Sequence, residues 1–112
     1  MTKEQYIKHC RGMLGAEVDQ PFEEDFNTYV ARHYDTRKWF ALIFDAKGRP
    51  AVNLKCDPME ADFLRRVYEG ITEGYHMNKT HWNTVYFDSD VPDDEFIRMT
   101  EISFNLTRKK RK

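Results

Sequence analysis

The residues best suited to chemistry gather in one short stretch, residues 76–82, which reads His-Met-Asn-Lys-Thr-His-Trp. It brings together two imidazoles, an ammonium group, an amide and an indole. A lysine neutralises phosphate charge, an amide makes directional hydrogen bonds, and an indole or imidazole ring offers a stacking face. This mixture suits a phosphate that is flanked by a base or by another planar group. The stretch therefore predicts a surface that binds another molecule.

A second source of positive charge, Lys55, is expected beside this stretch. It occupies an outward position of a predicted strand at 50–56, and we expect that strand to abut the 76–82 loop. Two cations and a ring would then lie together on one surface. The predicted binding site has five members: Lys55, Asn78, Lys79, His81 and Trp82.

A structural role for the same residues is the alternative. In that interpretation Trp82 is a core anchor, while His81 and Asn78 satisfy backbone groups of the loop. Lys79 is then merely solvated, although a lysine gains little from a structural role. The sequence leaves both interpretations open for Trp82 and favours binding for Lys79.

Catalysis and metal binding are less well supported by the spacing of the residues. Cys56 near His81 could form a thiolate–imidazolium pair, with Lys79 beside an oxyanion. However, no glycine-rich phosphate loop is present, and 112 residues leave little room for a deep pocket. His76 and His81 stand five residues apart, and the sequence contains neither a CxxC nor an HxxxH motif. We therefore expect a protein that is not an enzyme and that holds no metal or cofactor.

The composition is that of one globular domain. With 112 residues, of which 40% are hydrophobic and 14% aromatic, the chain can form a core without disulfides. No apolar run approaches the roughly 18 residues of a membrane span, and no signal-peptide pattern is present. The two cysteines, Cys10 and Cys56, are far apart and are expected to be reduced. These features predict a cytoplasmic protein that does not enter a membrane.

Charge is distributed unevenly along the chain. The net charge is −1, yet residues 108–112 are all basic, so residues 1–107 carry 13 Lys and Arg against 19 Asp and Glu, or −6. A protein that held nucleic acid by charge alone would be more basic. The basic tail is either an arm that displaces counterions from phosphates or a solvated helix end, and we favour the second. We expect a single domain at 1–107 followed by this tail.

Capping and turn residues predict the elements that must position the site. The residues expected to begin three helices are Thr2 with Gln5 in a capping box, Asp57 with Pro58, and Pro92. Strands are expected at 26–33, 38–45, 50–56 and 83–88, with room for a short strand in 74–82 and an exposed loop at 15–25. The order α-β-β-β-α-(β)-β-α predicts an α+β fold with a single, mostly antiparallel sheet and helices on one face.

Periodicity predicts which side chains are buried. Those expected inside are Met59, Phe63, Val67, Leu64 and Tyr68 from the second helix, and Phe96, Met99 or Thr100, Ser103 and Leu106 from the third. In the strand at 50–56, alternation places Asn53 and Lys55 outward, which predicts a sheet with one face in water. Gly48 is expected to take positive φ in the turn that leads into this strand.

Several short segments together resemble the MmcQ/YjbR family of small bacterial proteins, and the resemblance covers nearly the whole chain. The matching pieces are Pro21-Phe22, residues 38–41, residues 53–56, residues 74–82, Val91-Pro92 and Ser103-Phe104. The segment 78–82 is the most specific of these. The resemblance implies a CyaY-like fold with hairpins described as a double wing. Members are commonly described as DNA-binding, on the basis of that structural analogy.

The fold analogy also raises the question of a metal, because some relatives of the CyaY fold bind iron. The acidic residues at 93–95 already have a role at a helix N-terminus, so we expect no metal there. The preferred hypothesis is a non-enzymatic module that binds DNA through the surface around Lys55 and the 76–82 loop. The alternative is an adaptor that binds a protein or a small ligand, favoured by the charge of −6 and by Trp39, Trp82 and Tyr86 as interface anchors.

Overall fold

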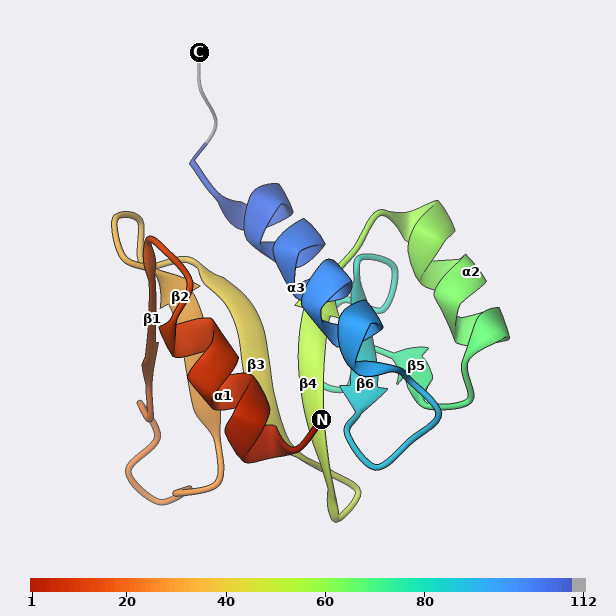
Figure 1. The fold of residues 1–112 in the computed structure, drawn as a ribbon, viewed down its shortest axis with the longest axis horizontal. Helices are drawn as coiled ribbons and strands as arrows, with labels where there is room; N and C mark the ends of the chain where they lie inside the picture. Colours follow the sequence, from red (N-terminus) through yellow and green to blue (C-terminus); the bar gives the residue numbers. More distant parts are fainter. Residues whose placement is uncertain (110–112) are drawn as a thin grey trace.

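Six antiparallel strands form one sheet, and three helices cover one of its faces (Figure 1). The computed structural model describes residues 1–109. The elements are α1 (Lys3–Arg11), β1 (Ala16–Asp19), β2 (Tyr29–His33), β3 (Trp39–Ala46), β4 (Arg49–Lys55), α2 (Pro58–Val67), β5 (Ile71–Glu73), β6 (Trp82–Tyr86) and α3 (Asp93–Thr107). The strand order across the sheet is β1-β2-β3-β4-β6-β5, so β1 and β5 are its edges. The predicted α+β fold is confirmed.

The helix starts follow the sequence signals. The Thr2 hydroxyl accepts a hydrogen bond from the backbone N–H of Gln5, and the Gln5 side chain accepts one from the Thr2 N–H, which completes the predicted capping box. The Asp57 carboxylate accepts from Met59 N–H at the start of α2, where Pro58 is the first helical residue. Pro92 precedes α3, and three acids occupy the first turn of that helix.

The turn between β3 and β4 has the predicted geometry. Lys47 (φ 53°) and Gly48 (φ 78°) both adopt left-handed backbone conformations, as a two-residue turn between twisted antiparallel strands requires. The register then pairs Ala46 with Arg49 and continues along both strands. The predicted hairpin is confirmed.

The prediction of an exposed loop at 15–25 was wrong for its first part. Residues Ala16–Asp19 form β1, which pairs antiparallel with β2. Ala16 and Val18 pack against the core, whereas Glu17 forms an ion pair with Arg37 and Asp19 forms one with Arg32. The acids that suggested a loop are therefore the outward half of an alternating strand.

The buried stripe predicted for α2 was right for Leu64 and in part for Tyr68, but wrong for its other three residues. Met59, Phe63 and Val67 are 83%, 62% and 50% exposed, whereas Ala61 and Leu64 face the sheet. The helix has two apolar sides. Because the Ala61 side chain is small, the backbone of α2 lies close to β6, and the Ala61 carbonyl accepts a hydrogen bond from Asn83 Nδ2 at 3.2 Å. On α3, similarly, Leu106 is exposed, and Thr107 is buried in addition to the other predicted inward residues.

The sheet face away from the helices is not uniformly wet. Asn53, predicted to face water, is fully buried, because the 74–82 loop folds back over it. Its Nδ2 donates to the Tyr75 carbonyl at 2.8 Å, and its Oδ1 accepts from the Thr84 hydroxyl at 2.5 Å. Thr84 Oγ1 in turn accepts from Tyr75 N–H at 2.8 Å. A closed set of hydrogen bonds therefore fixes the loop to β4 and β6.

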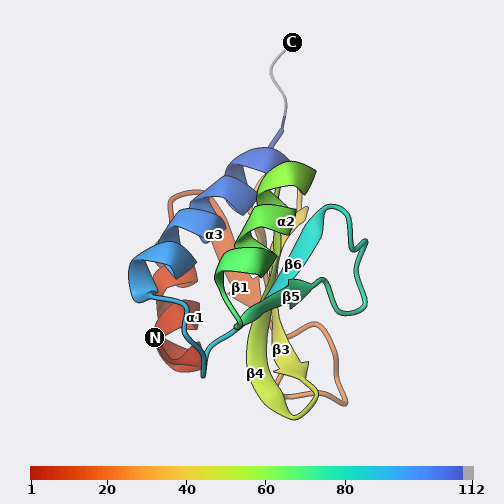
Figure 2. The same cartoon turned by 90° about the vertical axis from the view of Figure 1, so that its right-hand side faces the viewer.

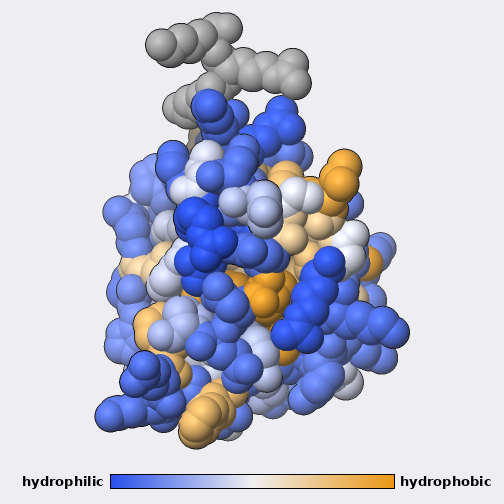
Figure 3. All heavy atoms as spheres, turned by 90° about the vertical axis from the view of Figure 1, so that its left-hand side faces the viewer, coloured by the Kyte–Doolittle hydropathy of each residue, from blue (hydrophilic) through white to orange (hydrophobic). Residues whose placement is uncertain are grey.

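The main core lies between the sheet and the helices. Tyr6, Phe40 and Phe96 are its largest fully buried side chains, and the Tyr6 hydroxyl shares a 2.6 Å hydrogen bond with Thr100 Oγ1. On the side of the molecule where β1 lies, the surface is largely hydrophilic, with separate small apolar areas (Figure 3). Among residues 1–109, no helix has the length and apolarity needed to cross a membrane.

Candidate functional site

Two of the five predicted site residues meet in the sheet. Lys55 is the last residue of β4, and Trp82, the first residue of β6, is its direct cross-strand partner. Side chains of such partners stand about 5 Å apart at Cβ and lie on the same face. Both are half-buried, so each keeps part of its surface accessible. Of the two cations and the ring that were predicted to lie together, Lys55 and Trp82 are therefore neighbours on one face of the sheet.

The other three residues stay in the loop and mainly shape it. The Asn78 side chain accepts from Thr80 N–H at 2.9 Å, and its carbonyl accepts from Trp82 N–H at 3.0 Å. The Lys79 ammonium donates to the Gly74 carbonyl at 3.0 Å and so closes the loop on itself. These contacts match the structural alternative for Asn78, and they show that the Lys79 ammonium is partly engaged within the loop.

His81 is exposed, as Asn78 and Lys79 also are. Its backbone carbonyl accepts from Cys56 N–H at 2.8 Å, which ties the end of the loop to the residue after β4. The imidazole itself is exposed. The backbone hydrogen bond therefore holds His81 next to the Lys55–Trp82 pair, and the imidazole ring is accessible to a ligand.

A groove lies at the end of the sheet where β3 begins, β4 ends and α3 ends, at the top of Figure 1. Its volume is about 680 Å³, and it is open to solvent. Its lining, called the basic groove below, consists of Thr36, Lys38, Trp39, Lys55, Leu106, Thr107, Arg108 and Lys109. Four of these eight residues are Lys or Arg and none is acidic. The groove is thus a concentration of positive charge on a chain whose first 107 residues sum to −6.

Sequence reasoning identified only Lys55 of these four cations as a site residue. Lys38 was noted merely as the start of a strand, and Arg108 and Lys109 as part of the basic tail. Their gathering depends on α3 ending beside β3, which no local pattern encodes. Within residues 1–109, none of the four cations forms an ion pair with a carboxylate.

Hydrogen bonds from α3 hold the walls of the basic groove. The Ser103 hydroxyl donates to the Phe40 carbonyl at 2.6 Å and accepts from Lys55 N–H at 2.9 Å, so one side chain joins α3 to both β3 and β4. One turn later, Thr107 Oγ1 lies 2.8 Å from His33 Nε2. Burial lowers the pKa of the His33 imidazole, which favours its neutral form in this contact. Arg108 and Lys109 therefore enter the groove from a helix end whose position is fixed.

Trp39 provides the aromatic surface of the groove. Its ring is half-buried and packs edge-on against Phe22, with 6.2 Å between ring centroids. Phe22 comes from the long connection between β1 and β2, so that connection holds one side of the Trp39 ring. An oriented indole between lysines can stack on a planar group while the cations contact its phosphate.

The cysteine chemistry considered from the sequence has no activated thiol to support it. Cys56 is only 6% exposed, and burial, with Glu60 and Asp57 nearby, raises the pKa of its thiol to about 11. Burial likewise raises the pKa of Cys10 to about 12. Both thiols are therefore protonated near neutral pH. Among the described residues, no three or more His, Cys, Asp or Glu side chains are grouped where they could hold a metal ion.

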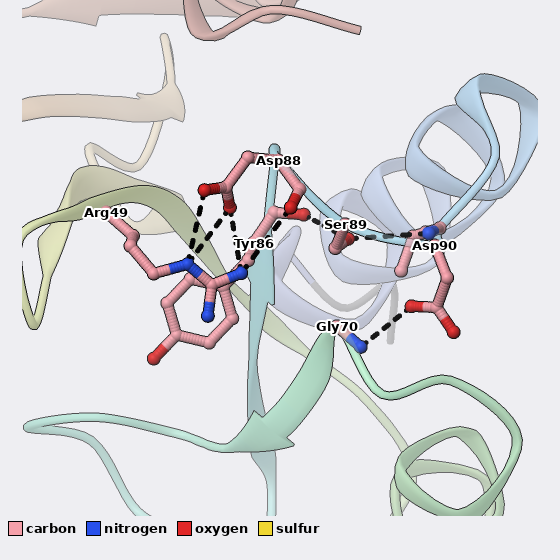
Figure 4. A network of polar contacts seen from close by, with 7 residues as sticks. Arg49, Gly70, Tyr86, Asp88, Ser89 and Asp90 are labelled. Atoms are coloured by element: carbon pink, nitrogen blue, oxygen red, sulfur yellow. Dashed lines mark hydrogen bonds and ion pairs between the residues drawn. The ribbon is translucent and has the colours of Figure 1, made fainter.

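A second polar cluster, at the opposite end of β6, contains an ion pair between Arg49 and Asp88 (Figure 4). The Arg49 guanidinium lies 4.1 Å from the centre of the Tyr86 ring and donates to the Asp88 carboxylate at 2.8 Å. That hydrogen bond lowers the pKa of Asp88. Next to it, Asp90 accepts from Gly70 N–H at 2.8 Å. This cluster fastens the β6–α3 connection to neighbouring segments, and it contrasts with the unpaired cations of the basic groove.

Known proteins resemble this chain in sequence and in structure. A family model described as YjbR matches residues 11–106. The uncharacterized protein YyaQ of Bacillus subtilis is 35% identical, over 96% of this chain and 99% of its own length. The uncharacterized protein YjbR of Escherichia coli is 32% identical, over 93% of this chain and 85% of its own length.

Two solved structures have the same fold. The crystal structure of a Pseudomonas syringae protein has a TM-score of 0.90 and 32% sequence identity, and covers 96% of this chain and 100% of that one. The crystal structure of a Deinococcus radiodurans protein has a TM-score of 0.80 and 28% identity, and covers 94% of this chain and 77% of that one.

Proposed function

The chain belongs to the YjbR family, and from this premise we propose that it is a non-enzymatic module that binds DNA in the basic groove. The observation that carries the proposal is the composition of the groove, with four cations and an indole and no carboxylate among its lining residues. Phosphate contacts supply most of the affinity of a protein for DNA, and an accessible ring adds stacking on a base. The description of the family's hairpins as a double wing supports the same ligand by analogy.

The arrangement of the groove favours contact with only a few phosphates. Its cations come from two sides, with Lys38 and Lys55 on the strands and Arg108 with Lys109 after α3. A ligand lying between them would have its backbone contacted from both sides and its base near Trp39. Three or four such contacts predict a slope of about −3 for log K against log salt on duplex DNA. Binding is therefore expected to be weak at physiological salt and clear at low salt.

The first prediction concerns the two strand lysines. Replacing Lys38 and Lys55 together with alanine is expected to weaken binding of a labelled 20-base-pair duplex at least about tenfold, and to reduce the salt slope by about 2. Fluorescence anisotropy at several salt concentrations measures both quantities, for duplex and for single strands. A variant with Lys8→Ala and Arg11→Ala is the matched control, since it removes the same charge from the exposed side of α1. Equal losses in both variants, or no binding by the native chain at low salt, would contradict the proposal.

Truncation separates the basic groove from the remainder of the basic tail. A chain that ends at Lys109 retains all four groove cations, whereas one that ends at Thr107 loses two of them. The proposal expects the first to keep most of the affinity and the second to lose it in proportion to the missing phosphate contacts. Affinity that disappeared entirely on removal of residues 110–112 would instead indicate non-specific attraction by the tail.

A protein-binding adaptor is the second candidate. The exposed apolar side of α2 favours it, because contiguous exposed apolar residues commonly mark interfaces. The two candidates use different surfaces. If the groove variants leave DNA binding unchanged, the DNA proposal fails, and protein binding by the apolar side of α2 can still be tested separately.

A further inference from the structure

Three large apolar side chains lie in a row on the outer side of α2. Met59, Phe63 and Val67, called the outward stripe below, are 83%, 62% and 50% exposed. Their spacing of four residues places them on one face of the helix and along nearly its whole length of ten residues, or about 15 Å. Single exposed apolar residues are ordinary on protein surfaces, but an aligned set of three indicates a face that another surface covers.

The helix is not free to turn this stripe inward. Its opposite side is already held by Ala61 and Leu64 against the sheet, and the Arg65 guanidinium donates to Asn83 Oδ1 at 2.8 Å. Glu60 is also fixed, by a 2.8 Å ion pair with Arg98 of α3. Figure 2 shows α2 at the front of the molecule, with no other segment of residues 1–109 crossing its outer side. Burial of the stripe therefore requires a second molecule.

The charges beside the stripe are arranged in a self-complementary way. Asp62 comes one position before Phe63 and Arg66 comes three positions after it, so both lie on the same flank of the stripe. Within one chain they form an exposed ion pair at 2.9 Å. The acid is nearer the start of the helix and the base is nearer its end, so a copy of the helix running in the opposite direction presents the complementary order.

We propose that a second copy of this chain covers the outward stripe, with the two α2 helices packed antiparallel about a two-fold axis at Phe63. Each Phe63 then meets its counterpart, and Met59 faces Val67 of the second copy. On the flank, Arg66 of each copy lies two positions, or about 3 Å along the helix axis, from the level of Asp62 of the second copy, an offset that the long arginine side chain can span. Such an isologous contact needs only one patch that complements itself, whereas an unrelated partner would need the same order of apolar and charged groups by coincidence.

The dimer is expected to be a weak one. A helix of ten residues provides an interface at or below the lower end of the range for specific complexes, roughly 1,200 Å² in total. The antiparallel helix dipoles and the ion pairs between the two copies stabilise the dimer in addition to the burial of apolar surface. A dissociation constant on the order of micromolar is consistent with an interface of this size.

The test is the concentration dependence of the mass without nucleic acid, measured by sedimentation equilibrium from about 1 µM to 1 mM. The native chain is expected to pass from monomer to dimer, and Phe63→Glu is expected to remain monomeric with an unchanged circular dichroism spectrum and unfolding midpoint. Phe26→Glu is the matched control, because Phe26 is equally large and 78% exposed but lies outside α2. A native chain that stays monomeric at 1 mM, or equal effects of the two variants, would overturn the proposal.

Charge exchange tests the antiparallel arrangement itself. Asp62→Arg alone and Arg66→Asp alone each place like charges opposite one another across the two-fold axis, so each is expected to weaken dimerisation about fivefold or more. The double variant with both substitutions restores opposite charges and is expected to recover native dimerisation. Failure of the double variant to recover, while both single variants weaken the dimer, would rule out this arrangement. These measurements do not depend on the basic groove.

Discussion

Replacing Gly70 with alanine is expected to lower the free energy of unfolding by about 3 kcal/mol, although the added group is a single methyl. A Cβ built at this position would lie 2.2 Å from Ser89 Oγ and 2.3 Å from Ser89 Cβ. These distances are far inside van der Waals contact, and the Gly70 N–H is simultaneously held by the Asp90 carboxylate. The connection between β6 and α3 must therefore move away from the turn between α2 and β5. Urea denaturation followed by fluorescence measures the change.

Two comparisons isolate the clash as the cause. Gly12→Ala, where a Cβ meets nothing closer than 3.5 Å and φ is −83°, is expected to alter stability by less than about 0.5 kcal/mol. In a background that already carries Ser89→Gly, both atoms nearest to the new methyl are gone. Gly70→Ala should then cost no more than about 1 kcal/mol, as a double-mutant cycle would show. An unchanged denaturation midpoint for Gly70→Ala in the native background would refute this account.

Asn53→Ala is expected to lower the free energy of unfolding by about 3 kcal/mol. The substitution removes a fully buried amide, which leaves the Tyr75 carbonyl without its donor and the Thr84 hydroxyl, which still accepts from Tyr75 N–H, without its acceptor. It thus combines lost hydrogen bonds with a small cavity beneath the 74–82 loop. Since the total stability of such a domain is about 5–15 kcal/mol, this is a large fraction.

The exposed Asn105 on α3 serves as the control for Asn53. Asn105→Ala removes the same group from the surface and should be neutral or slightly stabilising, because alanine is the better helix former. Hydrogen exchange adds a local measurement, since the Tyr75 amide, which donates to Thr84, should lose protection in the Asn53 variant before the core does. Equal stability of the two alanine variants would show that the buried amide contributes little.

The elements that were correctly predicted are those whose signals are local. The capping box at Thr2, the Asp57-Pro58 helix start and the left-handed Gly48 in the β3–β4 turn each depend on residues within four positions of one another. Local backbone geometry and hydrogen bonding determine such features almost independently of the remainder of the chain. These features define where the helices and strands begin and end, and the resulting order of elements predicts a sheet with helices on one face.

The features that were missed depend on tertiary context. Periodicity on α2 placed Met59, Phe63 and Val67 in one buried set with Leu64, whereas only the side of the helix that carries Leu64 faces the sheet. Alternation on β4 placed Asn53 outward correctly but could not show that a distant loop covers that face. In the candidate site, the pairing of Lys55 with Trp82 was within reach of strand reasoning. The approach of Arg108 to Lys38 was not, since it depends on where a helix ends in space.

The two outermost strands of the sheet have a consequence for behaviour at high concentration. An unpaired strand edge offers a template on which further chains can polymerise. Here one edge, β5, is only three residues long, and the other, β1, carries Glu17 and Asp19 in ion pairs with arginines of the same chain. Neither offers a long, uncharged row of free amides and carbonyls. The protein is therefore protected against runaway strand-by-strand growth, while the outer side of α2 remains free for a contact that stops at two copies.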